Sequence, residues 1–189
     1  MASPERPLRA DAARNRARVL EVAYETFAAE GLGVPIDEIA RRAGVGAGTV
    51  YRHFATKEEL YSAVVEDRLR RIIDDGRELL ADEEPGQALF TFLRSMTLKW
   101  GATDRGLSEA LAGSGVDIKA ALPDAETAFL TLLGDMLKAA QDAGTVRRDL
   151  EVSDVKALMV GAQAMQSYNA AAAERLVEVV LDGLRASAS

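Results

Sequence analysis

The chain has 189 residues, of which 48% are hydrophobic, 28% are charged and only 5% are aromatic, and its formal net charge is −7. It contains no cysteine and one histidine, His53, which excludes disulfides and thiolate sites and leaves little basis for a histidine metal site or a catalytic triad. No apolar stretch reaches the roughly 20 residues of a membrane span, and residues 1–10 lack the apolar core of a signal peptide. We therefore expect a cytoplasmic protein that is not an enzyme and holds no metal or cofactor.

The negative charge is unevenly distributed along the chain. Residues 1–60 hold nine Lys/Arg and nine Asp/Glu, so the whole acidic excess lies C-terminal to them. Residues 1–18 hold five arginines and two acids. A neutral N-terminal part with a basic arm is compatible with local phosphate binding.

The first 60 residues predict three helices, each with apolar residues at helical spacing. The first spans about residues 11–30 and ends at Gly31, a favourable C-terminal cap. The second begins at Pro35, whose fixed φ suits a first helical turn, and ends at Gly44. A glycine turn over residues 44–46 leads to a third short helix at about residues 47–54. The positions expected to be buried are Leu20, Ala23, Tyr24, Phe27, Ile36, Ile39, Ala40, Ala43, Val50 and Phe54.

Two short helices joined by a tight glycine turn predict a helix-turn-helix over about residues 36–54. In such motifs the N-terminal residues of the second helix face base edges in the major groove of DNA. Here those residues are Ala47, Gly48 and Thr49. Side chains on or beside the outward face that can donate to phosphates are Tyr51, Arg52, His53 and Lys57.

The remaining residues predict further helices with short loops. Thr56 and Glu59 have the capping-box spacing and open a long helix to about Leu80. Others are expected at about residues 85–103, 107–112, 125–143, from a cap at Ser153 to about 170, and 173–186. The sequence therefore predicts an all-α protein of about nine helices, with a DNA-binding head at residues 1–56 and a second domain at residues 57–189.

At residues 44–54 and 57–60 the sequence resembles the signature of TetR-family transcriptional regulators, and the resemblance extends over about residues 14–65. It implies a dimeric repressor that binds a palindromic operator and is released by a small molecule in the C-terminal domain. By the same resemblance, Thr49, Tyr51, His53 and Lys57 contact phosphates, while Ala47 and Gly48 face bases. Arg14 and Arg16 flank the head and are also expected at the DNA. One departure is Val34-Pro35, where the family often has Ser or Thr, so that phosphate contact is expected to be lost.

Two features of the C-terminal part predict an effector site and a dimer face. Apolar stripes on the helices at 85–103 and 125–143 either interdigitate or enclose a cavity, to which polar groups of the next helix could contribute. The candidate ligand-binding residues are Phe92, Met96, Trp100, Phe129, Leu133, Met136, Gln163 and Tyr168. The last helix carries an apolar arc too wide for one neighbour, which favours a partner chain. The candidate dimer residues are Val155, Met159, Ala162, Val177, Val180, Leu181 and Leu184.

Three alternatives remain open from the sequence. The first is a DNA-binding regulator without an effector, its cavity filled by side chains. The second is a helical protein-interaction adaptor, which salt-dependent DNA binding would distinguish. The third is a helical enzyme, for which no set of nucleophile, base and orienting residue is visible. If an effector exists, the lack of a basic cluster near the stripes favours an uncharged or weakly polar, partly aromatic molecule.

Overall fold

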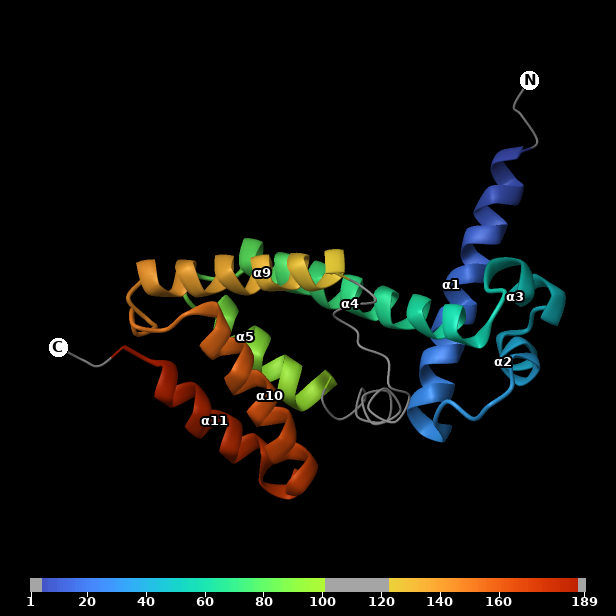
Figure 1. The fold of residues 1–189 in the computed structure, drawn as a ribbon. Helices are drawn as coiled ribbons and strands as arrows, with labels where there is room; N and C mark the ends of the chain where they lie inside the picture. Colours follow the sequence, from blue (N-terminus) through green and yellow to red (C-terminus); the bar gives the residue numbers. More distant parts are fainter. Residues whose placement is uncertain (1–4, 101–122, 187–189) are drawn as a thin grey trace. The chain divides into compact units, whose positions relative to one another are not determined.

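The computed structural model describes residues 5–100 and 123–186, and this part of the chain is almost wholly helical (Figure 1). Its only β pairing is one isolated bridge between Val146 and Arg185. A π-helical turn, Met96–Trp100, extends α5, and a 3-10 turn, Ala170–Ala172, precedes α11. The eight α-helices of the described residues are α1 (Glu5–Glu30), α2 (Ile36–Ala43), α3 (Ala47–His53), α4 (Lys57–Asp82), α5 (Ala88–Ser95), α9 (Pro123–Asp142), α10 (Val152–Tyr168) and α11 (Ala173–Leu184). The all-α prediction is confirmed, and the short helix expected at residues 107–112 lies outside the described residues.

The chain divides into two compact units, and the division falls within α4, between Arg68 and Leu69. We call the described residues 5–68 the head, and residues 69–100 with 123–186 the body. The first part of α4, residues 57–68, thus belongs with the head, whereas the sequence placed the boundary at residue 56.

Several helix ends follow the glycines that the sequence singled out. Gly31, Gly44 and Gly144 have φ of 75°, 67° and 71°, the left-handed conformation that ends α1, α2 and α9. Gly86 has φ of 93°, which is incompatible with a helix, so α5 begins at Ala88 and not at Pro85.

The predicted cap at Ser153 is wrong. Glu151 is the N-cap of α10, and its side chain accepts a hydrogen bond from the N–H of Asp154. The Asp154 carboxylate in turn accepts one from the N–H of Glu151 over 2.9 Å. This reciprocal pair satisfies two free N–H groups of the first turn, which a cap at Ser153 would leave to other partners.

The body is built around one continuous apolar core, to which α4, α5, α9, α10 and α11 all contribute. The side chains of Leu89, Phe92 and Leu133 are completely buried. The rings of Phe92 and Phe129 lie 6.2 Å apart between centroids, so the apolar stripes of α5 and α9 pack directly against each other. Of the two arrangements open from the sequence, the stripes interdigitate.

At Gly76, in the body part of α4, core side chains lie close to the helix backbone. A Cβ atom at Gly76 would lie 2.5 Å from Cδ2 of Leu132 and 2.9 Å from Cε2 of Phe92. Both side chains are buried and have little room to move away.

We predict that Gly76→Ala lowers the free energy of unfolding by roughly 1 kcal/mol, because overpacking of about 1–3 kcal/mol exceeds the helix-propensity gain of about 1 kcal/mol. Gly134→Ala is the matched control, since a Cβ there meets only Val152 Cγ2 at 3.5 Å. The control should gain up to about 1 kcal/mol from helix propensity alone. Urea denaturation measures both changes, and equal stabilisation by the two variants would contradict the packing of α4 described above.

Candidate DNA-binding site

The turn between α2 and α3 is closed by backbone hydrogen bonds. Gly44 donates to the carbonyl of Arg41 over 3.2 Å, and Val45 donates to the carbonyl of Ala40 over 3.0 Å. The left-handed Gly44 reverses the chain here at no steric cost. The helix-turn-helix expected from the sequence is present in the head.

Apolar contacts hold the two helices of this motif from beneath. α2 buries Ile36, Ile39, Ala40 and Ala43, the four residues predicted from its spacing. Val50 of α3 is fully buried and Phe54, directly after α3, is 3% exposed. With one face of α3 buried in this way, its opposite face is left to solvent.

The exposed face of α3 carries the polar residues that the sequence assigned to DNA. Tyr51 is 47% exposed, so much of its side chain is open to a partner. Arg52 and His53 are exposed, and Ala47, Thr49 and Lys57 are half-buried. Gly48 is exposed, and a Cβ built on it would meet nothing within 4 Å. No packing within the described residues therefore demands glycine at position 48.

The capping box expected at Thr56 and Glu59 is present, but the Glu59 side chain accepts from the N–H of Ala55 and not from that of Thr56. The N–H of Glu59 donates to Oγ1 of Thr56 over 3.1 Å, while the Glu59 carboxylate accepts from the N–H of Ala55 over 2.8 Å. This bond pattern ties the loop after α3 to α4 and sets Lys57 at the first position of the helix.

The two arginines of α1 expected at the DNA have partners within the head. Arg14 forms an ion pair with Asp11, one turn earlier on the same helix. The guanidinium of Arg16 lies 5.5 Å from the centroid of the Phe54 ring, a cation–π contact at the end of α3. Arg16 therefore contacts the helix-turn-helix, whereas Arg14 pairs with a residue of its own helix.

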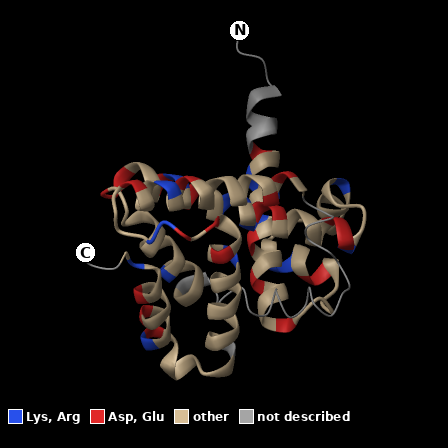
Figure 2. Ribbon diagram, turned by 60° about the vertical axis from the view of Figure 1, so that its left-hand side comes forward, with Lys and Arg blue, Asp and Glu red and all other residues tan. Residues whose placement is uncertain are grey.

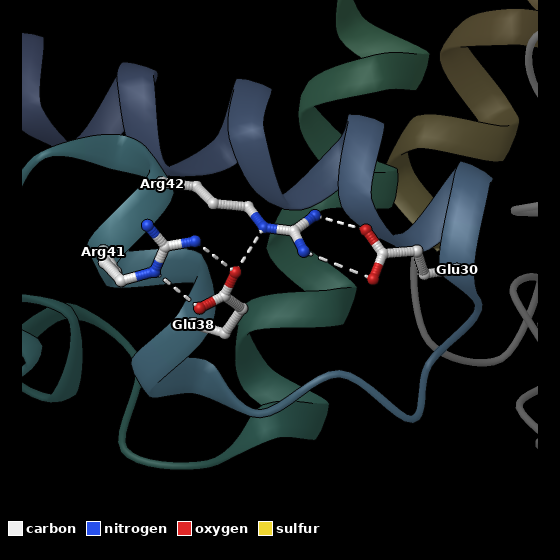
Figure 3. A network of polar contacts seen from close by, with 4 residues as sticks. All are labelled: Glu30, Glu38, Arg41 and Arg42. Atoms are coloured by element: carbon white, nitrogen blue, oxygen red, sulfur yellow. Dashed lines mark hydrogen bonds and ion pairs between the residues drawn. The ribbon is translucent and has the colours of Figure 1, made fainter.

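A network of four charged side chains joins α1 to α2, and the sequence reading missed it (Figure 3). Arg41 donates from Nε and Nη2 to the Glu38 carboxylate, both over 2.7 Å, and Arg42 donates from Nε to the same carboxylate over 2.8 Å. Arg42 also forms an ion pair with Glu30, the last residue of α1. The spacing of Glu38 to Arg41 and Arg42 signals the pairs within α2, but nothing local in the sequence signals the bond to Glu30.

These hydrogen bonds change the acidity of the network. Bonds from Arg41 and then Arg42 lower the pKa of Glu38 to about 2, and the bond from Arg42 lowers the pKa of Glu30. The same bonds raise the pKa of both arginines. At neutral pH the network is therefore ionised, with two positive and two negative charges that balance.

Tyr61 of α4 closes the head core against α1. Its ring meets that of Phe27 edge-on, with centroids 6.0 Å apart. The side chain is 4% exposed, and its hydroxyl has no hydrogen-bond partner. Burial raises the pKa of this phenol to about 12.

The residues expected to bind an effector are not gathered in one place. The five residues of the stripes, Phe92, Met96, Phe129, Leu133 and Met136, are buried in the body core. Gln163 is half-buried on α10, and Tyr168 is 93% exposed. The side chain of Trp100 is not among those that the structure describes.

A small apolar hollow in the body is lined by residues of α5, the π-helical turn, α10 and α11. Its free volume is about 10 Å³, no more than one water molecule occupies. Its lining residues are Leu93, Thr97, Leu158, Met159, Ala162, Val177, Val180 and Leu181. The hydroxyl of Thr97 donates to the carbonyl of Leu93, so it has its own partner.

Six of the seven residues expected at the dimer interface are buried within a single protomer. Val180 alone is partly exposed, while the other six belong to the core of the body. The six are Val155, Met159, Ala162, Val177, Leu181 and Leu184. The buried part of the α11 arc packs against α10 and the π-helical turn of its own chain, whereas Val179 is 62% exposed and Val180 partly exposed, so these two remain available to a partner.

Acidic residues recur on the helices of both units (Figure 2). Even so, within residues 5–100 and 123–186 no three His, Asp or Glu side chains are grouped so that they could hold a metal ion. None of the helices described is long and apolar enough to cross a membrane.

The all-helical fold and the exposed face of α3 define a helix-turn-helix transcriptional regulator. One family model, described as bacterial regulatory proteins of the tetR family, matches residues 19–64. Another, described as the C-terminal domain of SbtR-like transcriptional regulators, matches residues 84–186. The chain belongs to the TetR family of transcriptional regulators.

Solved structures similar to this chain support the assignment over almost its whole length. The TetR transcription regulatory protein from Mycobacterium vanbaalenii is 62% identical, with 95% of this chain and 99% of that chain covered and a TM-score of 0.80. TetR transcriptional regulator SCO0520 from Streptomyces coelicolor is 35% identical, with 92% and 99% covered and a TM-score of 0.75. A third, described as the molecular basis for control of antibiotic production by bacterial hormones, is 28% identical, with 92% and 98% covered and a TM-score of 0.73.

Among curated proteins, the similarity is confined to a shorter segment. An HTH-type transcriptional regulator from Staphylococcus aureus is 36% identical over 76 residues, which are 40% of this chain and 41% of that relative. The chain thus matches about two fifths of the length of such relatives.

We predict that Tyr61→Phe raises the free energy of unfolding by about 1 kcal/mol at pH 7, because it removes a buried hydroxyl without a partner and keeps the ring. The difference should grow as the pH rises from 10 to 12. In that range Tyr61 ionises in the unfolded chain but stays largely protonated in the folded head. The wild type therefore loses stability that the variant keeps. Denaturant titrations at pH 7, 10 and 11 measure both effects. A variant less stable than the wild type at pH 7 would show that the hydroxyl is satisfied in the folded protein.

Proposed function

We propose that this regulator is a dimeric repressor that binds an inverted-repeat operator through α3 and is released by a small molecule bound in the body. The observation that carries the proposal is the exposed face of α3, on which Tyr51, Arg52 and His53 are exposed together with an unobstructed Gly48. Operator binding requires access to the chromosome, which places the protein in the cytoplasm. The adaptor and enzyme alternatives are not favoured by any feature of the described residues.

The residues of the site fall into two groups by what they contact on the DNA. Thr49, Tyr51, His53 and Lys57 donate to phosphates and set the register of the protein on the duplex. Ala47 and Gly48 lie at the start of α3, the part of a recognition helix that faces base edges. With a hydrogen or a methyl group at these positions, the α3 backbone can approach the bases closely and read shape and thymine methyl groups.

We predict that Tyr51→Phe and Lys57→Ala weaken binding to all duplexes by similar factors, because phosphates carry no sequence information. An operator is first selected from a random-sequence duplex library with the wild-type protein. Affinities for it and for a scrambled duplex are then measured between 50 and 200 mM salt, conditions over which phosphate contacts dominate the salt dependence. Lys57→Ala should reduce the salt slope by about 1.

Failure to select any operator would refute the proposed function itself. A loss of sequence preference at unchanged affinity in Tyr51→Phe or Lys57→Ala would show only that these two residues read bases.

For the dimer, the exposed apolar residues of α10 and α11 offer a surface that one protomer leaves uncovered. In the described residues the large hydrophobic side chains exposed to solvent are Tyr51, Val160, Tyr168 and Val179, and three of these four lie on α10 and α11. Val160 is 56% and Val179 62% exposed. After its first turn, α10 carries exposed small or apolar residues at helical spacing: Ala157, Val160, Gly161, Ala164 and Tyr168. Exposed apolar faces of this kind mark protein–protein contacts, and we assign this one to the second protomer.

We predict that Val160→Asp yields folded monomers that no longer hold the operator, because burying the new carboxylate in the dimer interface is unfavourable. Thr131→Asp is the control, since it places the same charge on the exposed face of α9. Analytical ultracentrifugation at micromolar concentration measures the assembly, and circular dichroism checks the fold. A wild-type monomer, or a dimeric Val160→Asp variant, would contradict this assignment.

An effector site requires the body to rearrange. The hollow beside the π-helical turn has room for one water, so a ligand would have to displace its lining side chains, of which Met159 is the most adaptable. The walls are apolar and carry no charge, which supports an uncharged or weakly polar effector. The similar structure whose description names control of antibiotic production by bacterial hormones also supports regulation of this chain by a signal molecule. The small size of the hollow favours, as the second candidate, a regulator without an effector.

A further inference from the structure

We infer that Arg42 is a positioning residue for operator recognition: through Glu30 and Glu38 it holds α2 in one place on α1, and thereby sets the angle at which α3 meets DNA. This inference rests on the proposed function, because it concerns how well the same α3 discriminates its operator from other DNA.

The Arg42 guanidinium lies between two carboxylates that come from different helices (Figure 3). On one side its Nε donates to Oε1 of Glu38 in the first turn of α2 over 2.8 Å. On the other side its two terminal nitrogens both meet the carboxylate of Glu30, the last residue of α1, with Nη2 to Oε2 at 3.3 Å. A planar guanidinium with both edges occupied resists rotation, so the ends of α1 and α2 are held at a defined separation.

Apart from these bonds, α2 is held mainly by its buried apolar face. It is eight residues long, and Pro35 at its N-cap makes no side-chain hydrogen bond. Two of the four residues that it buries are alanines, Ala40 and Ala43, whose small side chains allow close approach but interlock little with neighbouring helices. A helix this short is marginal by itself and depends on its tertiary contacts. Polar contacts that fix its position along α1 therefore complement the apolar face formed by Ile36, Ile39, Ala40 and Ala43.

A displacement of α2 would be transmitted to α3. The two helices are joined by the turn at residues 44–46, which is closed by the bonds of Gly44 and Val45 to carbonyls of α2. Contacts to base edges require placement within about 0.5 Å, whereas phosphate contacts through long side chains tolerate larger shifts. Loss of the clamp should therefore reduce sequence discrimination more than general DNA affinity.

The test compares two glutamates of the same helix. Glu30→Gln removes the α1 end of the clamp, while Glu25→Gln makes the same change of charge at another exposed position of α1. Each variant is titrated with the operator selected by the wild-type protein and with a scrambled duplex of equal length. The ratio of the two affinities cancels the general gain in binding that comes from removing a negative charge.

We expect Glu30→Gln to lower this ratio about fivefold, in the range typical of coupled neighbouring residues, and Glu25→Gln to leave it within twofold of the wild type. Arg42→Lys should lower it as well, because a single ammonium cannot pair with both carboxylates as the guanidinium does. In the double variant Glu30→Gln, Arg42→Lys the loss should be no greater than in the more affected single variant, because the two residues act through each other.

Three results would overturn the inference while leaving the proposed function intact. An unchanged ratio in Glu30→Gln would show that the clamp does not set the angle of α3. An equal fall in Glu25→Gln would assign the effect to charge alone. A fall in affinity for both duplexes in Arg42→Lys, with a shallower salt slope, would make Arg42 a phosphate contact and not a positioning residue.

Discussion

The architecture of the head depends on the left-handed turn at Gly44. With φ of 67°, this residue ends α2 and lets its own N–H and that of Val45 bond to carbonyls of the last turn of α2. An L-residue with a side chain is disfavoured in this conformation, so the reversal would be strained with anything but glycine. Because the turn is so short, the apolar faces of α2 and α3 can be buried together, with Ala43 and Val50 both completely inaccessible. The opposite face of α3, with Tyr51, is left exposed as a consequence.

Polar interactions then refine what the turn and the apolar contacts establish. The pairing of Arg42 with Glu30 and Glu38 adds a polar link between α1 and α2 beside the apolar face that α2 buries. The bond from Glu59 to Thr56 sets the start of α4, and with it the position of Lys57. Each of these exposed contacts contributes little to stability by itself. Their importance in a DNA-binding head lies in geometry, because base readout is more sensitive to small displacements than folding is.

The head could be predicted closely from the sequence, because its signals are local. Glycines at 31 and 44 mark helix ends, and the apolar spacing of Ile36, Ile39 and Ala43 identifies the buried face of α2. The bond between Arg42 and Glu30 could not be predicted, because it joins residues on different helices whose separation depends on the fold. The cap of α10 was misassigned since Ser153 and Glu151 are both plausible caps, and only the partner at Asp154 decides between them.

The body was harder to predict for a different reason. An apolar residue signals that it will be buried, but not by which neighbour. Val177 and Leu181 were assigned to a partner chain, whereas their own chain covers them. The exposed residue Val160 looks like any other apolar residue of α10 in the sequence, and only its 56% exposure distinguishes it. The same ambiguity applied to the stripes of α5 and α9, which could line a cavity or fill it, and the contact of Phe92 with Phe129 shows that they pack together.

The central claim is that two copies of α3 read two symmetric half-sites of one operator. Hydroxyl-radical footprinting of the purified protein on a selected operator tests it most directly, because it maps where each head contacts the backbone. The account predicts two equivalent sets of protected sugars related by a two-fold axis, with half-site centres about 10 base pairs or a modestly longer spacing apart. A single asymmetric footprint, or protection that covers operator and flanking DNA alike, would contradict it.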